Sequence, residues 1–381
     1  MDFQFQDDDV AAAQLARGIL NDHATNERQK QLETSGATHD ETLWRALADA
    51  SVLGVAIPEE HGGAGLGFVA LGLLLQEVGR AVAKVPAYPA LALGALPLAR
   101  FGSDAQKKSL LPGLARGERI VTAALGEYES SDPLAPAARA VRELDGRHRL
   151  HGVKSMVPAA QLASHVIVPA RCDDGSIALF LVEPGASGVT LAAQETSDGQ
   201  PHAEMTLDGV RVDDASRLAP GRGATAGGDA LRWIVERAIV ARCMMQLGVI
   251  ERALEMTAQY GRDRVQFDRP IGSFQAVHQR AADAYIDAAA IRLTAWEAAW
   301  HLASELPASH HVAVAKFWAA EGGQSASYAC QHLHGGIGID VDYPLHRHFR
   351  WAIQIEHELG SAKHHLERLG RDIAAHGLPA A

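Results

Sequence analysis

The segment QHLHGGIGID at residues 331–340 places two histidines one residue apart, followed by three glycines within four positions. Imidazole nitrogens at close spacing are potential ligands of a transition metal. Glycines let backbone N–H groups approach a phosphate closely, and they also end helices. The segment is therefore compatible with a metal site, a phosphate-binding turn, or a plain helix boundary.

A metal site is the weakest of these interpretations, because no further ligands lie at a recognisable spacing from His332 and His334. The three cysteines, Cys172, Cys243 and Cys330, form no CxxC pair, which argues against a zinc ribbon or a disulfide framework. We therefore expect that the protein binds no metal and that it resides in a reducing compartment.

Composition limits the class of protein. The 381 residues are 47% hydrophobic and 21% charged, which is typical of a soluble protein of two or three domains. The net charge of −11 argues against unaided binding to nucleic acid or to anionic membranes. The acidic start, MDFQFQDDDV, does not resemble a signal peptide, and the apolar stretch at 88–99 is too short to span a bilayer. These features predict a cytoplasmic protein.

The elements that position the glycine-rich segment follow from the patterning. Apolar residues recur at three- and four-residue intervals before about residue 120, as in 68–83, and predict helices. Short β-rich runs then predict strands, and Asp-Gly pairs between them predict hairpins at 144–150 and 172–177. The predicted strands lie at 165–170, 177–182, 188–193 and 203–212.

Helix returns after GRGATAGG at 221–228, which we interpret as a linker. The buried seam of a long bundle helix is predicted from residues at alternating steps of three and four: Leu231, Ile234, Ala238, Ala241, Met245 and Gly248. The predicted fold is mainly α with a central antiparallel β domain. Its parts are an N-terminal helical domain (1–120), a middle β-barrel domain (121–222) and a C-terminal four-helix bundle domain (223–381).

Three segments in this order resemble the acyl-CoA dehydrogenase family. They are LGVAIPEEHGGAGLG (53–67), YGRDRVQFDRPIGSFQAVHQRAAD (260–283) and LHGGIGIDVDYPLHRHFR (333–350). The resemblance covers nearly the whole chain. It implies FAD as cofactor, an acyl-CoA substrate, electron-transfer flavoprotein as electron acceptor, and a tetramer in which each FAD lies between subunits.

One half of the family's FAD site, here called the β-domain half-site, embraces the flavin ring. The family pattern there is matched by Glu127, Ser131 and Asp132 in ALGEYESSD (124–132). Met156 replaces the expected tryptophan and Pro158 the expected threonine. Methionine does not stack like an indole, and proline lacks a backbone N–H and a hydroxyl. We therefore expect this half-site to be eroded.

The other half, here called the bundle half-site, serves the adenosine and pyrophosphate of an FAD held mainly by a neighbouring subunit. The resemblance assigns it Arg264, Gln266, Phe267, Gly335 and Gly336, with His332 where the family has glutamine. This half-site is largely kept, although Asp268 replaces a common glycine. On this interpretation, the segment at 331–340 lies at a helix boundary, where its glycines let the backbone come close to a phosphate of FAD. A purely structural turn remains the alternative.

Dehydrogenation of an acyl-CoA needs a carboxylate that removes the α-proton. The family places this base at one of two positions, which the resemblance maps to Leu359 and Ala238. Neither side chain accepts a proton. Glu358, Glu356 and Glu236 are possible substitutes, although we expect each to be a solvated carboxylate. We also expect Arg237 and Arg242 to be surface charges rather than ligands of a CoA phosphate.

These departures resemble the small, non-catalytic subunit of heteromeric acyl-CoA dehydrogenases, as in pimeloyl-CoA or steroid side-chain degradation. The leading hypothesis is an accessory subunit in an α2β2 assembly with a paralogous catalytic chain. One alternative is a self-sufficient homo-oligomer with a relocated glutamate base. Others are a binding or structural protein on this fold, and an oxygenase or oxidase that needs no such base.

Overall fold

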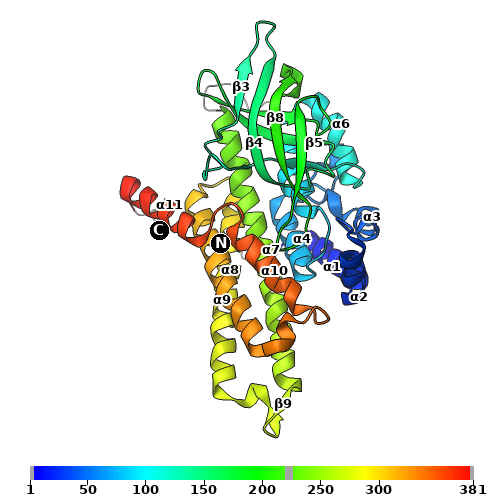
Figure 1. The fold of residues 1–381 in the computed structure, drawn as a ribbon, viewed down its shortest axis with the longest axis vertical. Coiled ribbons are helices and arrows are strands. Elements are labelled where there is room, and N and C mark those ends of the chain that lie inside the picture. The colour runs from blue at the N-terminus through cyan, green and yellow to red at the C-terminus, as the bar shows by residue number, and fades with distance from the viewer. Residues whose placement is uncertain (1–3, 219–225, 378–381) are drawn as a thin grey trace. The chain divides into compact units, whose positions relative to one another are not determined.

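The computed structural model describes residues 4–218 and 226–377 (Figure 1). It contains two compact units. One comprises residues up to 19, 36–71 and 84–238, and the other comprises 20–35, 72–83 and the chain from 239 onward. The long helix α7 (Ala226–Asp263) contributes to both. The three-domain division predicted from the sequence stays a prediction.

The chain before β1 is helical, as predicted. Its α-helical and π-helical segments are α1 (Asp7–His23), α2 (Asn26–Ser35), α3 (Glu41–Asp49), α4 (Phe68–Arg80), η3 (Tyr88–Ala95), α5 (Leu96–Phe101) and α6 (Asp104–Ala115). Helix α3 begins at Asp40, whose carboxylate accepts from the N–H groups of the first turn. The apolar stretch at 88–99 lies in η3 and α5. No helix within the described ranges is long and apolar enough to cross a membrane.

The central sheet belongs to the first unit. Its strands are β1 (Val121–Ala123), β2 (Gly126–Glu127), β3 (Arg139–Arg142), β4 (His148–Pro158), β5 (His165–Cys172), β6 (Ile177–Val182), β7 (Val189–Gln194) and β8 (His202–Val212). The order is β1-β5-β3-β4-β8-β7, with β2 paired to β4 and β6 to β5. Alternate apolar side chains, among them Leu150, Phe180 and Met205, form one buried core.

Both predicted hairpins are confirmed. Gly146 and Gly175 have φ values of 85° and 80° in the β3–β4 and β5–β6 turns, where glycine avoids the strain of a left-handed backbone. The prediction of a wholly antiparallel sheet was wrong, because β5 pairs in parallel with both β1 and β3. Long connections separate these strands along the chain, which is the condition that parallel pairing requires.

The second unit is a helical bundle. Besides α2 and the second half of α7, it contains α8 (Gln275–Ala303), α9 (Ser309–His334), α10 (Leu345–His357) and α11 (Ala362–His376). Helices α8 and α9 lie side by side as a helical hairpin (Figure 1). A short hairpin of β9 (Val265–Gln266) and β10 (Arg269–Pro270) joins α7 to α8. Helical segments before and after a central sheet along the chain confirm the predicted fold class.

The predicted seam of α7 is confirmed, since each of its six residues is buried. Gly248 on this seam permits a close helix approach, because a Cβ there would lie 1.9 Å from the carbonyl oxygen of Gln76 on α4. The predicted linker at 221–228 is only partly described: residues 219–225 lie outside the described ranges, and α7 already begins at Ala226.

Candidate functional site

The carboxylate of Glu127, in the β-domain half-site, is bound by other groups of the same chain. Its carboxylate forms a buried ion pair with Lys154 on β4 and accepts from the N–H groups of Ala137 and Ala138. Lys154 is 1% exposed, and it also donates to the carbonyl of Pro169 at 2.7 Å. Burial lowers the pKa of Lys154, and Glu127 opposes that shift. These contacts give Glu127 a structural role; its role toward a cofactor stays a prediction.

The position where the family has a tryptophan lies in a β-bulge. Met156 has a φ of 52° there, and its N–H donates to Gln194 Oε1 at 2.8 Å. Gln194 in turn donates to Tyr128 Oη at 2.7 Å, and Tyr128 donates to Glu204 at 3.0 Å. The chain's own side chains therefore bond a backbone donor that would otherwise be open to a ligand.

The remaining residues of this half-site are divided between surface and core. Ser131 and Asp132 lie in an exposed turn, where the Asp132 carboxylate accepts from the N–H of Leu134 at 2.9 Å. Pro158 is buried at the end of β4. Neither methionine nor proline reproduces the stacking or hydrogen bonding expected of the family residues.

The bundle half-site has the opposite character, because its residues are exposed. Phe267 and Asp268 form the two-residue loop between β9 and β10, with φ values of 53° and 60°. Positive φ at both positions is the pattern of a type I′ hairpin, which favours Asn, Asp or Gly. Phe267 is 87% exposed. The guanidinium of Arg264 is exposed too, and it has no side-chain partner within the described part of the chain.

A hollow of about 470 Å³ lies at the base of this hairpin and is mainly apolar. Pro270 and Ile271 line it from the hairpin side, and Leu333 lines it from α9, two residues before Gly335. The two segments assigned to the bundle half-site are about seventy positions apart in the sequence. The fold brings their neighbours around one pocket.

The glycine pair lies at a helix boundary, as predicted. Helix α9 ends at His334, and Gly335 follows with a φ of 63°. A Cβ added at Gly335 or Gly336 would meet no atom within 4 Å, so both face open space. Such space is what a closely approaching anion would require.

The two histidines of the segment have different environments. His332 is exposed. His334 is buried and stacks on Tyr260, with its ring nitrogens 2.8 Å from the carbonyl of Cys330 and 3.1 Å from Tyr343 Oη. Burial lowers the pKa of His334, and the Cys330 carbonyl opposes that shift. Both ring nitrogens are thus engaged in structural contacts.

Neither position to which the resemblance maps the family base carries a carboxylate. Ala238 is fully buried on α7, and Leu359 lies just after α10 with a φ of 58°. The carbonyl groups of Ile355 and Glu356 before this turn accept from the buried amine of Lys316, at 2.6 and 3.1 Å. Burial lowers the pKa of Lys316 to about 8. This contact fixes the end of α10 and opposes a shift of the turn.

The prediction that the three substitute glutamates are solvated was wrong. Glu358 pairs with Arg242 at 2.6 Å, and its side chain is 13% exposed. Glu356 accepts from Gln324 at 2.9 Å, and Glu236 is buried on α7. The Glu358 carboxylate is therefore occupied by its ion pair with Arg242 rather than open to solvent.

The two arginines expected at the surface are buried as well. Arg242 is 2% exposed and pairs with Glu358. Arg237 is also buried, and its guanidinium lies over the indole of Trp233, 3.7 Å from the ring centroid. Trp233 and Arg237 are four positions apart on α7 and therefore share a face. The sequence shows these charges, but it does not show which of them find partners.

Comparisons with known proteins define the class. The family model described as "Acyl-CoA dehydrogenase, N-terminal domain" matches residues 6–118, and that described as "Acyl-CoA dehydrogenase, C-terminal domain" matches residues 226–374. Together they cover well over half of the sequence. The chain belongs to the acyl-CoA dehydrogenase family.

Individual relatives align along almost their full length. Acyl-CoA dehydrogenase FadE27 of Mycobacterium tuberculosis is 39% identical over 94% of this chain and 95% of its own. The solved ChsE4–ChsE5 complex from Mycobacterium tuberculosis contains a chain that is 39% identical, with full coverage of both chains and a TM-score of 0.92. A variant of the Tcur3481–Tcur3483 steroid ACAD is 44% identical over 97% of this chain and 98% of that one, with a TM-score of 0.89.

Proposed function

We propose that this chain is the accessory subunit of a heteromeric, FAD-dependent acyl-CoA dehydrogenase. The observation that supports this proposal most strongly is the contrast between the two half-sites. The bundle half-site is exposed and open, whereas in the β-domain half-site the Met156 N–H and the Glu127 carboxylate are bonded by other groups of the chain. A chain that completes the FAD site of a partner needs the first half-site and not the second.

The residues present fit the phosphate side of FAD. The exposed guanidinium of Arg264 suits a pyrophosphate, and the open Gly335–Gly336 backbone suits a close phosphate oxygen. Exposed Phe267 offers an apolar surface to the adenosine part. FAD, when bound, accepts the hydride from the acyl chain. This chain's residues hold and orient it, while the partner supplies the ring contacts and the base.

Exposed apolar side chains support a partner subunit. On α8, Tyr285, Ile286 and Leu293 are 64%, 63% and 72% exposed. Large apolar side chains gathered on one exposed helix are typical of an interface. The relatives ChsE4–ChsE5 and Tcur3481–Tcur3483 are pairs of different chains, and the second is called a steroid ACAD. A steroid-like CoA ester is accordingly the substrate class we favour, with electron-transfer flavoprotein as acceptor.

Flavin content tests the proposal. We expect colourless protein from this chain alone, and about one FAD per two chains when it is co-expressed with a paralogous acyl-CoA dehydrogenase chain. Arg264→Ala should weaken FAD binding in that complex about tenfold or more, since it removes a charge-assisted contact to phosphate. Arg142→Ala, an exposed arginine at the end of β3, is the matched control. About one FAD per chain from this protein alone would overturn the proposal.

Turnover by glutamate variants separates the proposal from a self-sufficient enzyme. Glu356→Gln and Glu236→Gln should change the turnover of the complex by less than about twofold, because neither carboxylate removes the α-proton. Loss of a general base costs about a hundredfold or more, so a drop of that size would favour the alternative. Glu358→Gln is tested with a parallel measurement of stability, since it leaves Arg242 buried without a carboxylate.

A further inference from the structure

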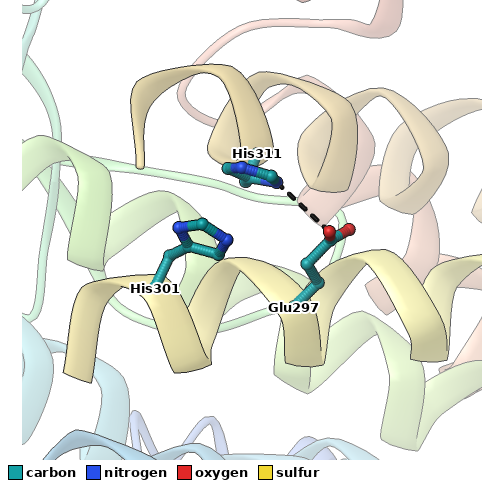
Figure 2. Close-up of side chains that lie close together, drawn as sticks. All are labelled: Glu297, His301 and His311. Atoms are coloured by element: carbon teal, nitrogen blue, oxygen red, sulfur yellow. Dashed lines mark ion pairs between the residues drawn. The ribbon is translucent and has the colours of Figure 1, made fainter. Parts of the chain in front are cut away.

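A cluster of two histidines and a glutamate lies where α8 and α9 meet, in the second unit. Glu297 and His301 are four positions apart on α8 and therefore share a face. His311 lies in the first turn of α9, after the short connection that follows α8. The three side chains point toward one another, and their ligand atoms all lie within 4.8 Å (Figure 2).

The surroundings of His301 fix which of its ring nitrogens is free. Nδ1 lies 3.1 Å from the carbonyl oxygen of Pro307. Since a carbonyl only accepts, Nδ1 donates in this contact, and Nε2 is the ring nitrogen left to face a ligand. A metal-binding histidine almost always donates its other N–H to a carbonyl or a carboxylate in this way. The backbone of the α8–α9 connection thus presets the tautomer that a metal requires.

His311 lies close to both of the other side chains. Its ring stacks on that of His301 with centroids 3.7 Å apart, and its Nδ1 lies 3.4 Å from Glu297 Oε1.

We propose that Glu297, His301 and His311 form a binding site for a divalent transition-metal ion, with Zn²⁺ as the best match. Two imidazole nitrogens and one carboxylate oxygen leave a fourth position for water. Ligand atoms around tetrahedral zinc lie about 3.3 Å apart, so the side chains must rotate, and the two stacked rings must turn out of their near-parallel arrangement, to close the site. The Glu297 side chain is 54% exposed and has room to move. The bound ion would tie the end of α8 to the start of α9.

Zinc titration of the full chain tests this proposal. Untagged protein, stripped with a chelator, is titrated with Zn²⁺ in competition with a chromophoric chelator. We expect about one tight Zn²⁺ per chain and a higher melting temperature with the metal. His301→Ala and His311→Ala should each weaken binding at least about 100-fold and abolish the shift in melting temperature. Glu297→Gln should weaken binding about tenfold.

His310→Ala is the matched control, because the ring of His310 stands edge-on to that of His311 at 5.9 Å but is not part of the cluster. It should bind Zn²⁺ like the wild type. Circular dichroism checks that each variant is folded. Absence of stoichiometric binding would overturn the proposal. So would binding that survives in both histidine variants, or an equal loss in His310→Ala.

Discussion

Lys154→Met should lower the free energy of unfolding by about 3–5 kcal/mol, as expected when one partner of a buried ion pair is removed. The substitution leaves the Glu127 carboxylate inside the sheet without its counter-ion, and it also removes the hydrogen bond to the carbonyl of Pro169. Chemical denaturation followed by circular dichroism measures the loss.

A double-mutant cycle shows whether the buried charge is the cause. In the Lys154→Met background, Glu127→Gln should recover part of the lost stability, because it removes the unpaired charge while its one amide oxygen still accepts from the N–H of Ala137 or Ala138. In the wild-type background the same Glu127→Gln change should be destabilising. Equal effects in the two backgrounds would show that the two residues are not coupled.

Acidification should destabilise the second unit through His348. This side chain on α10 is buried, with its ring nitrogens 3.1 Å from the carbonyl of Arg80 and 3.3 Å from that of Pro344. Burial lowers its pKa to about 4; the two carbonyls oppose that shift, and the charges of Arg252 and Arg347 add to it.

The direction of the change in stability follows from which state of the chain, folded or unfolded, binds the proton. Above pH 6.5 the imidazole is neutral in both states, and the stability is fully present. As the pH falls from about 6.5 toward 4, the unfolded chain takes up a proton that the folded chain does not, so stability is lost. Between pH 7 and pH 5 we expect a loss of about 2 kcal/mol from this group.

His348→Gln isolates this contribution, because glutamine retains a donor for the Arg80 carbonyl but does not titrate. The variant should lose about 2 kcal/mol less than the wild type between the two pH values. His365 is likewise buried with a pKa of about 4, so the comparison of wild type and variant, rather than either curve alone, carries the result. Equal losses in both proteins would contradict the assignment.

Much of the fold was predictable because it depends on local rules. The seam of α7 follows from helical periodicity, and the β3–β4 turn follows from the conformational freedom of Gly146. The parallel pairs of β5 were not predictable, because a strand segment does not specify the direction of a neighbour distant in sequence. That choice is made by packing across the whole sheet.

The candidate site could be read from the sequence only as residue types at mapped positions, as at Leu359 and Ala238, whose assignment as base positions stays a prediction. It was not predictable where the outcome depends on a tertiary partner. Glu358 and Arg242 are both charged and were therefore expected at the surface, yet each offsets the other's desolvation. The cluster of Glu297 with His301 and His311 was also missed, because only two of its three residues, Glu297 and His301, show a regular spacing.

The exposed apolar side chains of α8 have a consequence for the cell. Tyr285, Ile286 and Leu293 resemble the surfaces that chaperones and proteases recognise on incompletely assembled proteins. We expect a copy made in excess of its partner to be degraded. The abundance of this chain would then follow the rate at which the partner is synthesised, and the subunit ratio would be set after translation.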